Sequence, residues 1–123
     1  VAGQLKDVDA IFDSGKILTD KSDYIFQAVL YSIIEQTNDA DNNPNHKPVS
    51  PALLFIQHAG SDHYSPIVTL GGEPVTNAAA YEADFENFLK AKLEELFGSE
   101  TFVPTSNQRI CEYCPYNQLC GRG

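Results

Sequence analysis

Two long segments with helical periodicity dominate the sequence and limit the folds that it can adopt. Residues 23–36 are apolar around most of a helical circumference, which predicts a helix buried on several sides with Asp23 as its N-cap. Residues 79–97 carry a single apolar stripe, with acidic residues early, lysines later and Gly98 as a stop signal. The stripe consists of Tyr81, Phe85, Phe88, Leu89, Leu93, Leu96 and Phe97. We expect the two helices to share one core.

Shorter apolar runs predict the remaining elements. The spacing of apolar residues predicts a short amphipathic helix over residues 4–13, ended by Asp13 and the residues after it. Residues 52–57 and 67–70 have the length and composition of strands and predict a two-stranded element. Residues 37–51, rich in asparagine and proline, predict a solvated loop. The expected fold class is therefore α/β, with two main helices and a small sheet.

The charge balance and the chain ends restrict partners and location. Seventeen acidic against eight basic residues give a net charge of −9, so any nucleic-acid contact must be local or supplied by other parts of a longer protein. The absence of methionine and the start at Val1 lead us to expect a piece cut from such a protein. Neither a membrane span nor a signal-peptide pattern occurs, so we expect no membrane and a cytoplasmic location.

All three cysteines lie near the C-terminus, where Cys111, Cys114 and Cys120 form a Cys-x2-Cys-x5-Cys pattern. Such a pattern can bring thiolates to one point, as in zinc and iron-sulfur sites, but it is one ligand short of the usual four. Three interpretations stay open: a histidine completes the site, a fourth cysteine lies outside this chain, or no metal binds. The available histidines are His46, His58 and His63. None has metal-ligand spacing to the cysteines, and we expect ordinary surface or turn histidines.

Gln27 and Tyr31 are polar groups within the apolar helix of residues 23–36. Their spacing of four residues places them on the same helical face, one turn apart. A purely structural role would have Gln27 satisfying a backbone group in the core and Tyr31 packing its ring with the hydroxyl at the edge. A Gln-x3-Tyr pair is a weak signal by itself, and it gains weight only in combination with the cysteines.

The order of these features resembles the C-terminal part of the PD-(D/E)xK nuclease superfamily, in particular its RecB-like and AddB-type branch of helicase-nucleases and CRISPR-associated exonucleases. The resemblance covers residues 11–122 and rests on the Gln-x3-Tyr helix, the run Pro51-Ala-Leu-Leu-Phe55, the long amphipathic helix and the cysteines. It implies that residues 1–123 form the C-terminal part of a RecB-like nuclease domain with a restriction-endonuclease-like fold. Residues 99–123 would be an extended, cysteine-bearing tail.

The resemblance also implies an activity and site residues. The parent protein would be a Mg²⁺-dependent DNA exonuclease of recombination or double-strand break repair that works with a helicase domain or subunit. Gln27 and Tyr31 match the helix that shapes the active site and contacts DNA in this family. Cys111, Cys114 and Cys120 match three of the four ligands of a 4Fe-4S cluster, whose remaining cysteine lies far upstream in the family.

The chain departs from the family where catalysis is concerned. The family's metal-binding core is an aspartate on one strand, followed by Glu or Asp, one residue and Lys on the next. Here no apolar strand precedes the helix of residues 23–36. Gln4-Leu5-Lys6 has a neutral amide in place of the carboxylate, and Asp20-Lys21 lacks the intervening residue. We therefore expect Mg²⁺ to bind only in the parent, the catalytic strands and fourth cysteine to lie upstream, and this chain alone to be inactive.

A second function class is a binding module without catalysis. In it, the three cysteines and one further ligand hold zinc, and the acidic surface docks a protein partner. Metal analysis separates the two classes, because iron with sulfide indicates the nuclease tail whereas stoichiometric zinc indicates the module.

Overall fold

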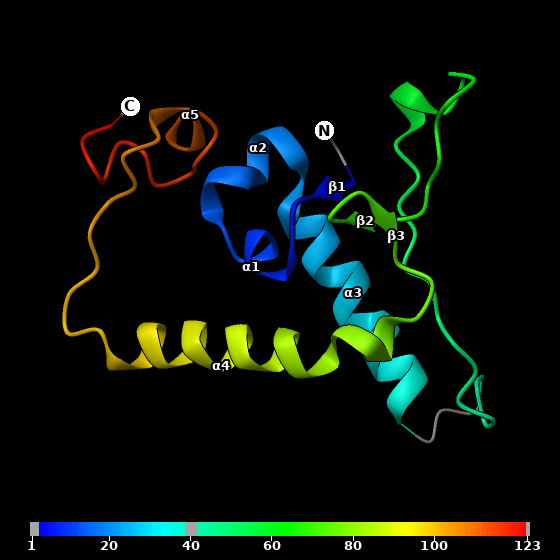
Figure 1. The fold of residues 1–123 in the computed structure, drawn as a ribbon. Helices are drawn as coiled ribbons and strands as arrows, with labels where there is room; N and C mark the ends of the chain where they lie inside the picture. The colour runs from blue at the N-terminus through cyan, green and yellow to red at the C-terminus, as the bar shows by residue number, and fades with distance from the viewer. Residues whose placement is uncertain (1–2, 39–41, 123) are drawn as a thin grey trace. The chain divides into compact units, whose positions relative to one another are not determined.

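The computed structural model describes residues 3–38 and 42–122 (Figure 1). The chain divides into two compact units, Val1–Leu93 and Glu94–Gly123, which are treated separately below. The first unit contains the sheet and the hydrophobic core, and the second contains the cysteines. Within the described residues, none of the helices has both the length and the apolar character that crossing a membrane requires.

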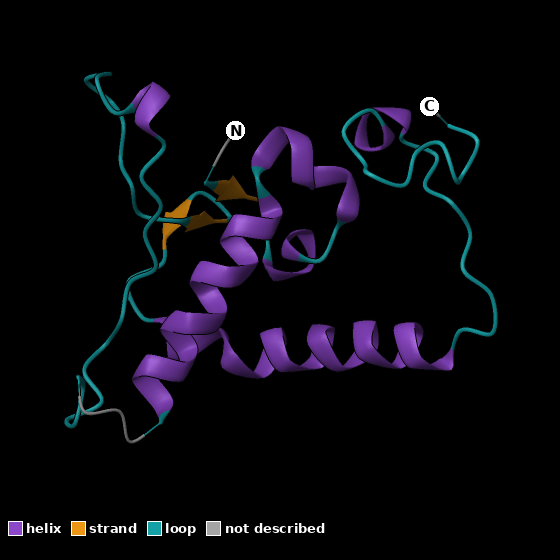
Figure 2. Ribbon diagram, turned by 180° about the vertical axis from the view of Figure 1, so that it is seen from behind, coloured by secondary structure: helices purple, strands orange, loops and turns teal. Residues whose placement is uncertain are grey.

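The sheet has three short strands in the order β1-β2-β3. Strand β1 (Gln4–Leu5) pairs in parallel with β2 (Thr69–Leu70), which pairs antiparallel with β3 (Glu73–Pro74). Gly71 and Gly72 join the last two strands, and both have positive φ, of 64° and 81°, as a tight two-residue hairpin turn requires. The α/β class is confirmed, and helices make up most of the regular secondary structure (Figure 2).

The predicted helix over residues 4–13 is wrong in its first half. Residues Gln4–Leu5 form strand β1, which is held by hydrogen bonds from β2 and the residue after it. For example, Gly71 N donates to Leu5 O at 2.9 Å. Helix α1 spans only Val8–Ile11, because Asp7 acts as N-cap and accepts a hydrogen bond from Ala10 N at 2.9 Å. A strand of two residues therefore precedes the long helix, but half of it is polar, because residue 4 is an exposed glutamine with a neutral amide.

The predicted strand pair over residues 52–57 and 67–70 is reduced to one isolated bridge, between Ala52 and Ile67. Strand β2 pairs instead with β1 and β3, and residues Ile56–His58 form the 3-10 helix η2. A tyrosine side chain explains the change. The Tyr64 hydroxyl accepts from Phe55 N and donates to Leu53 O, both at 2.7 Å, which satisfies backbone groups that a strand would offer to its neighbour.

Helix α3 spans Ser22–Thr37 and follows η1 (Ser14–Lys16) and α2 (Ile17–Asp20), which the sequence pattern did not indicate. Its N-cap is Lys21, with φ 58°, and not Asp23, which lies in the first turn. Lys21 both ends α2 and starts α3, so its left-handed conformation turns the chain between them.

The buried side chains of α3 lie on one side of the helix, and the opposite side is exposed. Ile25, Val29 and Ile33 are buried at intervals of four residues. Tyr24, Tyr31 and Ile34 are exposed. The predicted burial around most of the circumference is therefore wrong for this face, which leaves aromatic rings accessible to solvent.

The core of the first unit lies between α1, α3, and the start of α4 (Glu82–Gly98), which follows η3 (Ala78–Tyr81). The Phe85 side chain is only 2% exposed, and its ring centroid lies 5.2 Å from that of Phe12 and 5.5 Å from that of Phe26. These three rings form the aromatic centre of the core. The buried apolar residues are Leu5, Val8, Ile11, Ile25, Val29, Ile33, Val68, Leu70, Val75, Ala78 and Phe85.

Only the first half of the predicted apolar stripe on α4 is covered. Phe85 is buried, and Tyr81, Phe88 and Leu89 are partly buried against the core. The later members of the stripe, Leu93, Leu96 and Phe97, are exposed. The boundary between the two units falls within this helix, after Leu93.

The buried side chain of Gln36, 7% exposed, ties the end of α3 to two other segments. Its Oε1 accepts from Val49 N at 3.2 Å and Ala79 N at 3.1 Å, while its Nε2 donates to Asn77 Oδ1. Residues 42–51 contain no helix or strand, and residues 39–41 of the predicted loop lie outside the described residues. One amide therefore fixes both this loop segment and η3 on the helix.

We expect Gln36→Leu to lower the free energy of unfolding by roughly 2 kcal/mol or more. The variant keeps most of the volume, but it leaves the N–H groups of Val49 and Ala79 without their acceptor, and each costs about 1–3 kcal/mol when buried. Urea denaturation followed by circular dichroism measures the loss. The control is Gln57→Leu, at an exposed position, and an equal effect of both changes would contradict the role of Gln36.

Candidate functional site

Gln27 and Tyr31 form an exposed, hydrogen-bonded pair on α3. The Nε2 atom of Gln27 donates to the Tyr31 hydroxyl oxygen at 3.1 Å, and Tyr31 is 59% exposed. The structural role that would put Gln27 in the core is therefore wrong. The pair offers solvent an amide carbonyl, which can accept, and a phenolic hydroxyl, which can still donate its proton. Neutral donors and acceptors of this kind suit a polar ligand.

Tyr24 shares the exposed face of α3 with this pair. Residues 24, 27 and 31 follow the i, i+3, i+7 spacing of one helical face, opposite the buried residues 25 and 29. We call Tyr24, Gln27 and Tyr31 the tyrosine face. The sequence reasoning did not single out Tyr24, although its spacing from Gln27 was the signal that could have found it.

A groove of about 470 Å³ opens beside Tyr24, between the start of α3 and the segment that follows Ala52. It is lined by Lys21, Tyr24 and residues 53–58, and is called the Tyr24 groove below. Its lining contains one lysine, one histidine and no carboxylate, in a chain whose net charge is −9. The groove is thus a part of the surface where an anionic ligand meets little repulsion.

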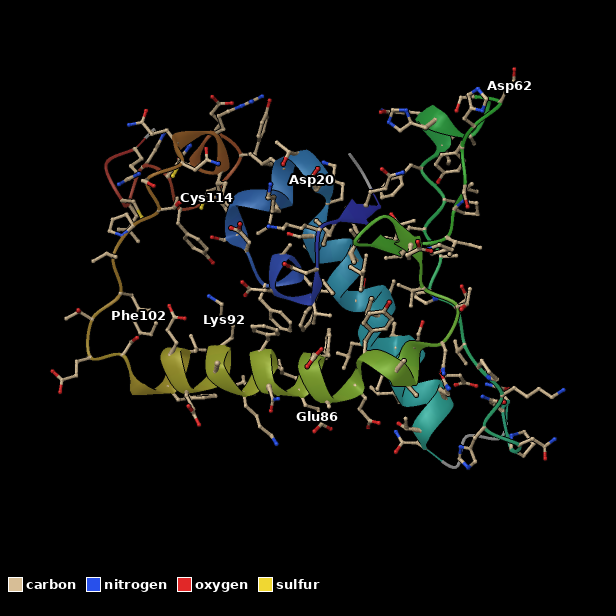
Figure 3. All side chains as sticks on the ribbon, in the orientation of Figure 1. Asp20, Asp62, Glu86, Lys92, Phe102 and Cys114 are labelled. Atoms are coloured by element: carbon tan, nitrogen blue, oxygen red, sulfur yellow. The ribbon has the colours of Figure 1, made fainter. Side chains whose placement is uncertain are left out.

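A second depression, of about 450 Å³, is lined by residues from both of the rejected catalytic candidates. Gln4 and Lys6 come from the first candidate, and Asp20, which Figure 3 labels, comes from the second. Three of its four carboxylates already have other roles. Those of Asp7 and Asp13 each accept a backbone N–H at 2.9 Å as caps of α1 and η1, and Asp20 lies 3.7 Å from the Lys16 ammonium. Within residues 3–38 and 42–122, no group of three His, Cys, Asp or Glu side chains is arranged to hold a metal ion.

The second unit places the cysteines on a short helix and the turns after it. Helix α5 (Gln108–Cys111) has Asn107 as its N-cap, whose side chain accepts from Arg109 N at 3.2 Å, so the tail expected over residues 99–123 is not extended throughout. Cys114 N donates to Cys111 O at 3.1 Å, as the tight Cys-x-x-Cys turn requires. All three cysteines are free thiols, and Figure 3 labels Cys114 in these turns.

The histidines have local surroundings in the first unit. His46 Nδ1 lies 2.8 Å from the Gln36 carbonyl oxygen, to which it donates, because a carbonyl can only accept. His58 is the last residue of η2 and lines the Tyr24 groove, and His63 is exposed in a turn. These positions agree with surface and turn histidines.

The second unit lacks a core of its own. None of residues 94–122 is buried, and Figure 3 shows Phe102 on the segment that links α4 to the cysteine turns. Its exposed large apolar side chains are Leu96, Phe97, Phe102, Val103, Ile110, Tyr113, Tyr116 and Leu119. Units of this size without buried side chains usually depend on a metal, a disulfide or a partner for stability.

Comparison with known families decides the class of protein. A family model of the PD-(D/E)XK nuclease superfamily matches residues 13–121, a range that contains Gln27, Tyr31 and all three cysteines. The chain belongs to the PD-(D/E)XK nuclease superfamily. Comparisons with curated proteins and with solved structures gave no match.

Membership of the PD-(D/E)XK nuclease superfamily points to nuclease function, and the small α/β fold is consistent with it. The Asp/Glu-x-Lys residues after which the superfamily is named are nevertheless missing from this sequence. No Asp/Glu-x-Lys sequence occurs anywhere in the 123 residues. The candidate site in this chain is therefore the tyrosine face with its groove, a surface suited to binding.

Proposed function

We propose that this chain is the DNA-contacting C-terminal part of a Mg²⁺-dependent exonuclease of the RecB-like branch, which acts with a helicase in recombination or double-strand break repair. The observation that carries the proposal is the exposed Gln27–Tyr31 hydrogen bond, within a range that matches the superfamily. A side-chain pair that is exposed contributes little to the core, and its polar atoms are accessible to a ligand.

Neutral hydrogen-bonding groups explain how an acidic chain contacts DNA. The Tyr31 hydroxyl can donate to a phosphate oxygen, and Gln27 holds that hydroxyl in place through its amide. Such contacts position the DNA backbone without needing an extended basic surface, which a chain with a net charge of −9 is poorly suited to form. The pair would therefore act locally, beside a catalytic centre formed by other sequence.

The described residues do not fit a catalytic Mg²⁺ site. In the depression of about 450 Å³, the carboxylates of Asp7 and Asp13 cap helices, and that of Asp20 lies 3.7 Å from the Lys16 ammonium. In addition, no Asp/Glu-x-Lys is available to orient a metal and water. We therefore assign the catalytic carboxylates to sequence outside this chain. The 123-residue chain with Mg²⁺ and linear DNA should release no nucleotides above the buffer control, and appreciable cleavage would overturn this assignment.

The cysteines suit a soft metal or cluster by their chemistry. Cys111, Cys114 and Cys120 are three thiols within ten residues, on a unit with no buried side chain to hold it together. Among the described residues they do not form a three-ligand group, so binding would require the turns after Cys111 to rearrange. In the proposed parent they would supply three of four ligands to a 4Fe-4S cluster, which would fix the tail structurally.

Gln27→Ala should weaken DNA binding about fivefold while leaving the stability of the chain nearly unchanged. The change removes one hydrogen bond, worth about 1 kcal/mol, that orients the Tyr31 hydroxyl. Anisotropy of a fluorescently labelled oligonucleotide, at low ionic strength, measures the change. Gln118→Ala, at an exposed position in the second unit, is the matched control. Equal affinities for the wild type and Gln27→Ala would contradict a role of the pair in binding.

A zinc-binding interaction module is the second candidate. The exposed apolar side chains of the second unit and the acidic composition favour it, since both suit a protein partner. Stoichiometric zinc in a colourless protein that does not bind DNA would establish this alternative in place of the nuclease proposal.

A further inference from the structure

We propose that the Tyr24 groove receives an unpaired base of single-stranded DNA, with Tyr24 stacking on the base and Lys21 contacting a neighbouring phosphate. This inference rests on the proposed function, because it names the form of DNA that the tyrosine face would bind. It adds Lys21, Tyr24 and the opposite wall of the groove to the two residues that the family resemblance supplies.

The groove has the size and surface for one planar base. Its volume of about 470 Å³ lies within the range of small-ligand pockets, and its walls are mostly apolar. Tyr24 is 52% exposed on one wall, and Ile56, 83% exposed, belongs to the other. A half-exposed phenol ring beside apolar side chains is the surface on which bases stack in proteins that bind single strands.

The wall opposite Tyr24 is held in place by hydrogen bonds and does not need the ligand to form. The Tyr64 hydroxyl bridges Phe55 N and Leu53 O, both at 2.7 Å, and Leu53 N donates to Pro66 O at the same distance. His58 N donates to Phe55 O at 2.9 Å and closes η2. The groove is therefore a preformed feature, which lowers the entropic cost of binding.

The charges around the groove favour a phosphate over an acidic or cationic ligand. Lys21 and His58 lie in the lining, and no carboxylate does. Asp23 is on the same helix, but it is one residue from Tyr24 and so lies about 100° around the helical axis. Asp20 faces Lys16 at 3.7 Å. A polyanion thus finds a local cation here, although the chain as a whole is acidic.

The position of the groove on α3 argues for a single strand and against a duplex. Tyr24, Gln27 and Tyr31 lie on one face, and the two tyrosines are about 10 Å apart along the helix axis, so one strand could contact both. A base can enter the groove only if it is unpaired and unstacked, which costs energy in a duplex but little in a single strand. The alternative occupant is an apolar peptide, for which neither Lys21 nor the tyrosine face has a role.

Binding of labelled oligo(dT) to the 123-residue chain, compared with binding of the same label on duplex DNA, tests the inference. We expect the single strand to bind at least about fivefold more tightly than the duplex, and Tyr24→Ala to weaken its binding by at least the same factor. Tyr24→Phe keeps the ring and should bind like the wild type. Lys21→Gln should reduce the slope of log affinity against log salt by about one. Phe97→Ala, an exposed ring outside the groove, is the control.

The outcomes separate this inference from the proposed function. Equal binding of single strand and duplex, or wild-type affinity in Tyr24→Ala, would overturn the groove assignment. If Gln27→Ala still weakened binding in that case, the proposed function would stand without it. Failure of the wild-type chain to bind either form of DNA would overturn both. Circular dichroism of each variant confirms that the exposed substitutions leave the fold intact.

Discussion

Phe85→Ala is expected to lower the free energy of unfolding by about 3–5 kcal/mol, the cost of removing a large aromatic side chain from a packed core. Phe85 is 2% exposed and its ring lies within 5.5 Å, centroid to centroid, of those of Phe12 and Phe26. Domains of this size are stable by only about 5–15 kcal/mol, so much of the folded population would be lost on mild heating. Urea denaturation monitored by circular dichroism measures the change.

The same helix provides the control for this prediction. Phe97 belongs to the same apolar stripe of α4 but is 81% exposed, so Phe97→Ala should change the free energy of unfolding by about 0.5 kcal/mol or less. If the two substitutions destabilised the chain equally, the placement of the core at the start of α4 would be wrong.

Cys114→Ser is expected to abolish metal binding by the tail. The wild-type chain, reconstituted with iron and sulfide without oxygen, should bind less than one cluster per chain, because three thiols leave one position of a cluster without a protein ligand. Serine keeps the size of the side chain but replaces the soft thiolate with a hard hydroxyl. Iron and sulfide analysis, together with the visible absorption of the protein, measures the loss.

A neighbouring substitution serves as the control for the cysteine prediction. Tyr113 lies between the first two cysteines and is exposed, so Tyr113→Phe should leave the iron content unchanged. Iron content that is the same in Cys114→Ser and in the wild type would show that iron binds elsewhere. Stoichiometric zinc, lost in the serine variant, would favour the interaction module.

The long elements of the fold could be predicted from the sequence, and the short ones could not. Periodicity located α3 and α4 because each repeats its pattern over several turns. Strands of two residues have no such repeat. Strand β1 forms because its backbone pairs with β2, where Gln4 is opposite Thr69, a partner 65 positions later that the local sequence does not reveal.

 Gln4 and Thr69 are separated by the 64 residues of positions 5–68, so the pairing of β1 with β2 depends on the tertiary fold.

One part of the candidate site could be predicted from the sequence, and another part could not. The spacing of Gln27 and Tyr31 placed them on one face, and their hydrogen bond at 3.1 Å agrees with that placement. The Tyr24 groove was not predictable, because its opposite wall comes from residues 53–58 and is held by Tyr64. When only the local sequence is considered, a run of apolar residues predicts a buried strand. Only the tertiary structure shows that Leu54 and Ile56 remain exposed.

The most direct test of the central claim is a titration of labelled DNA with the purified 123-residue chain at low ionic strength, followed by fluorescence anisotropy. The account predicts saturable binding that weakens as salt is added and that falls in Gln27→Ala. The absence of saturable binding to single-stranded and duplex DNA alike would contradict the assignment of this chain to the DNA-contacting part of a nuclease.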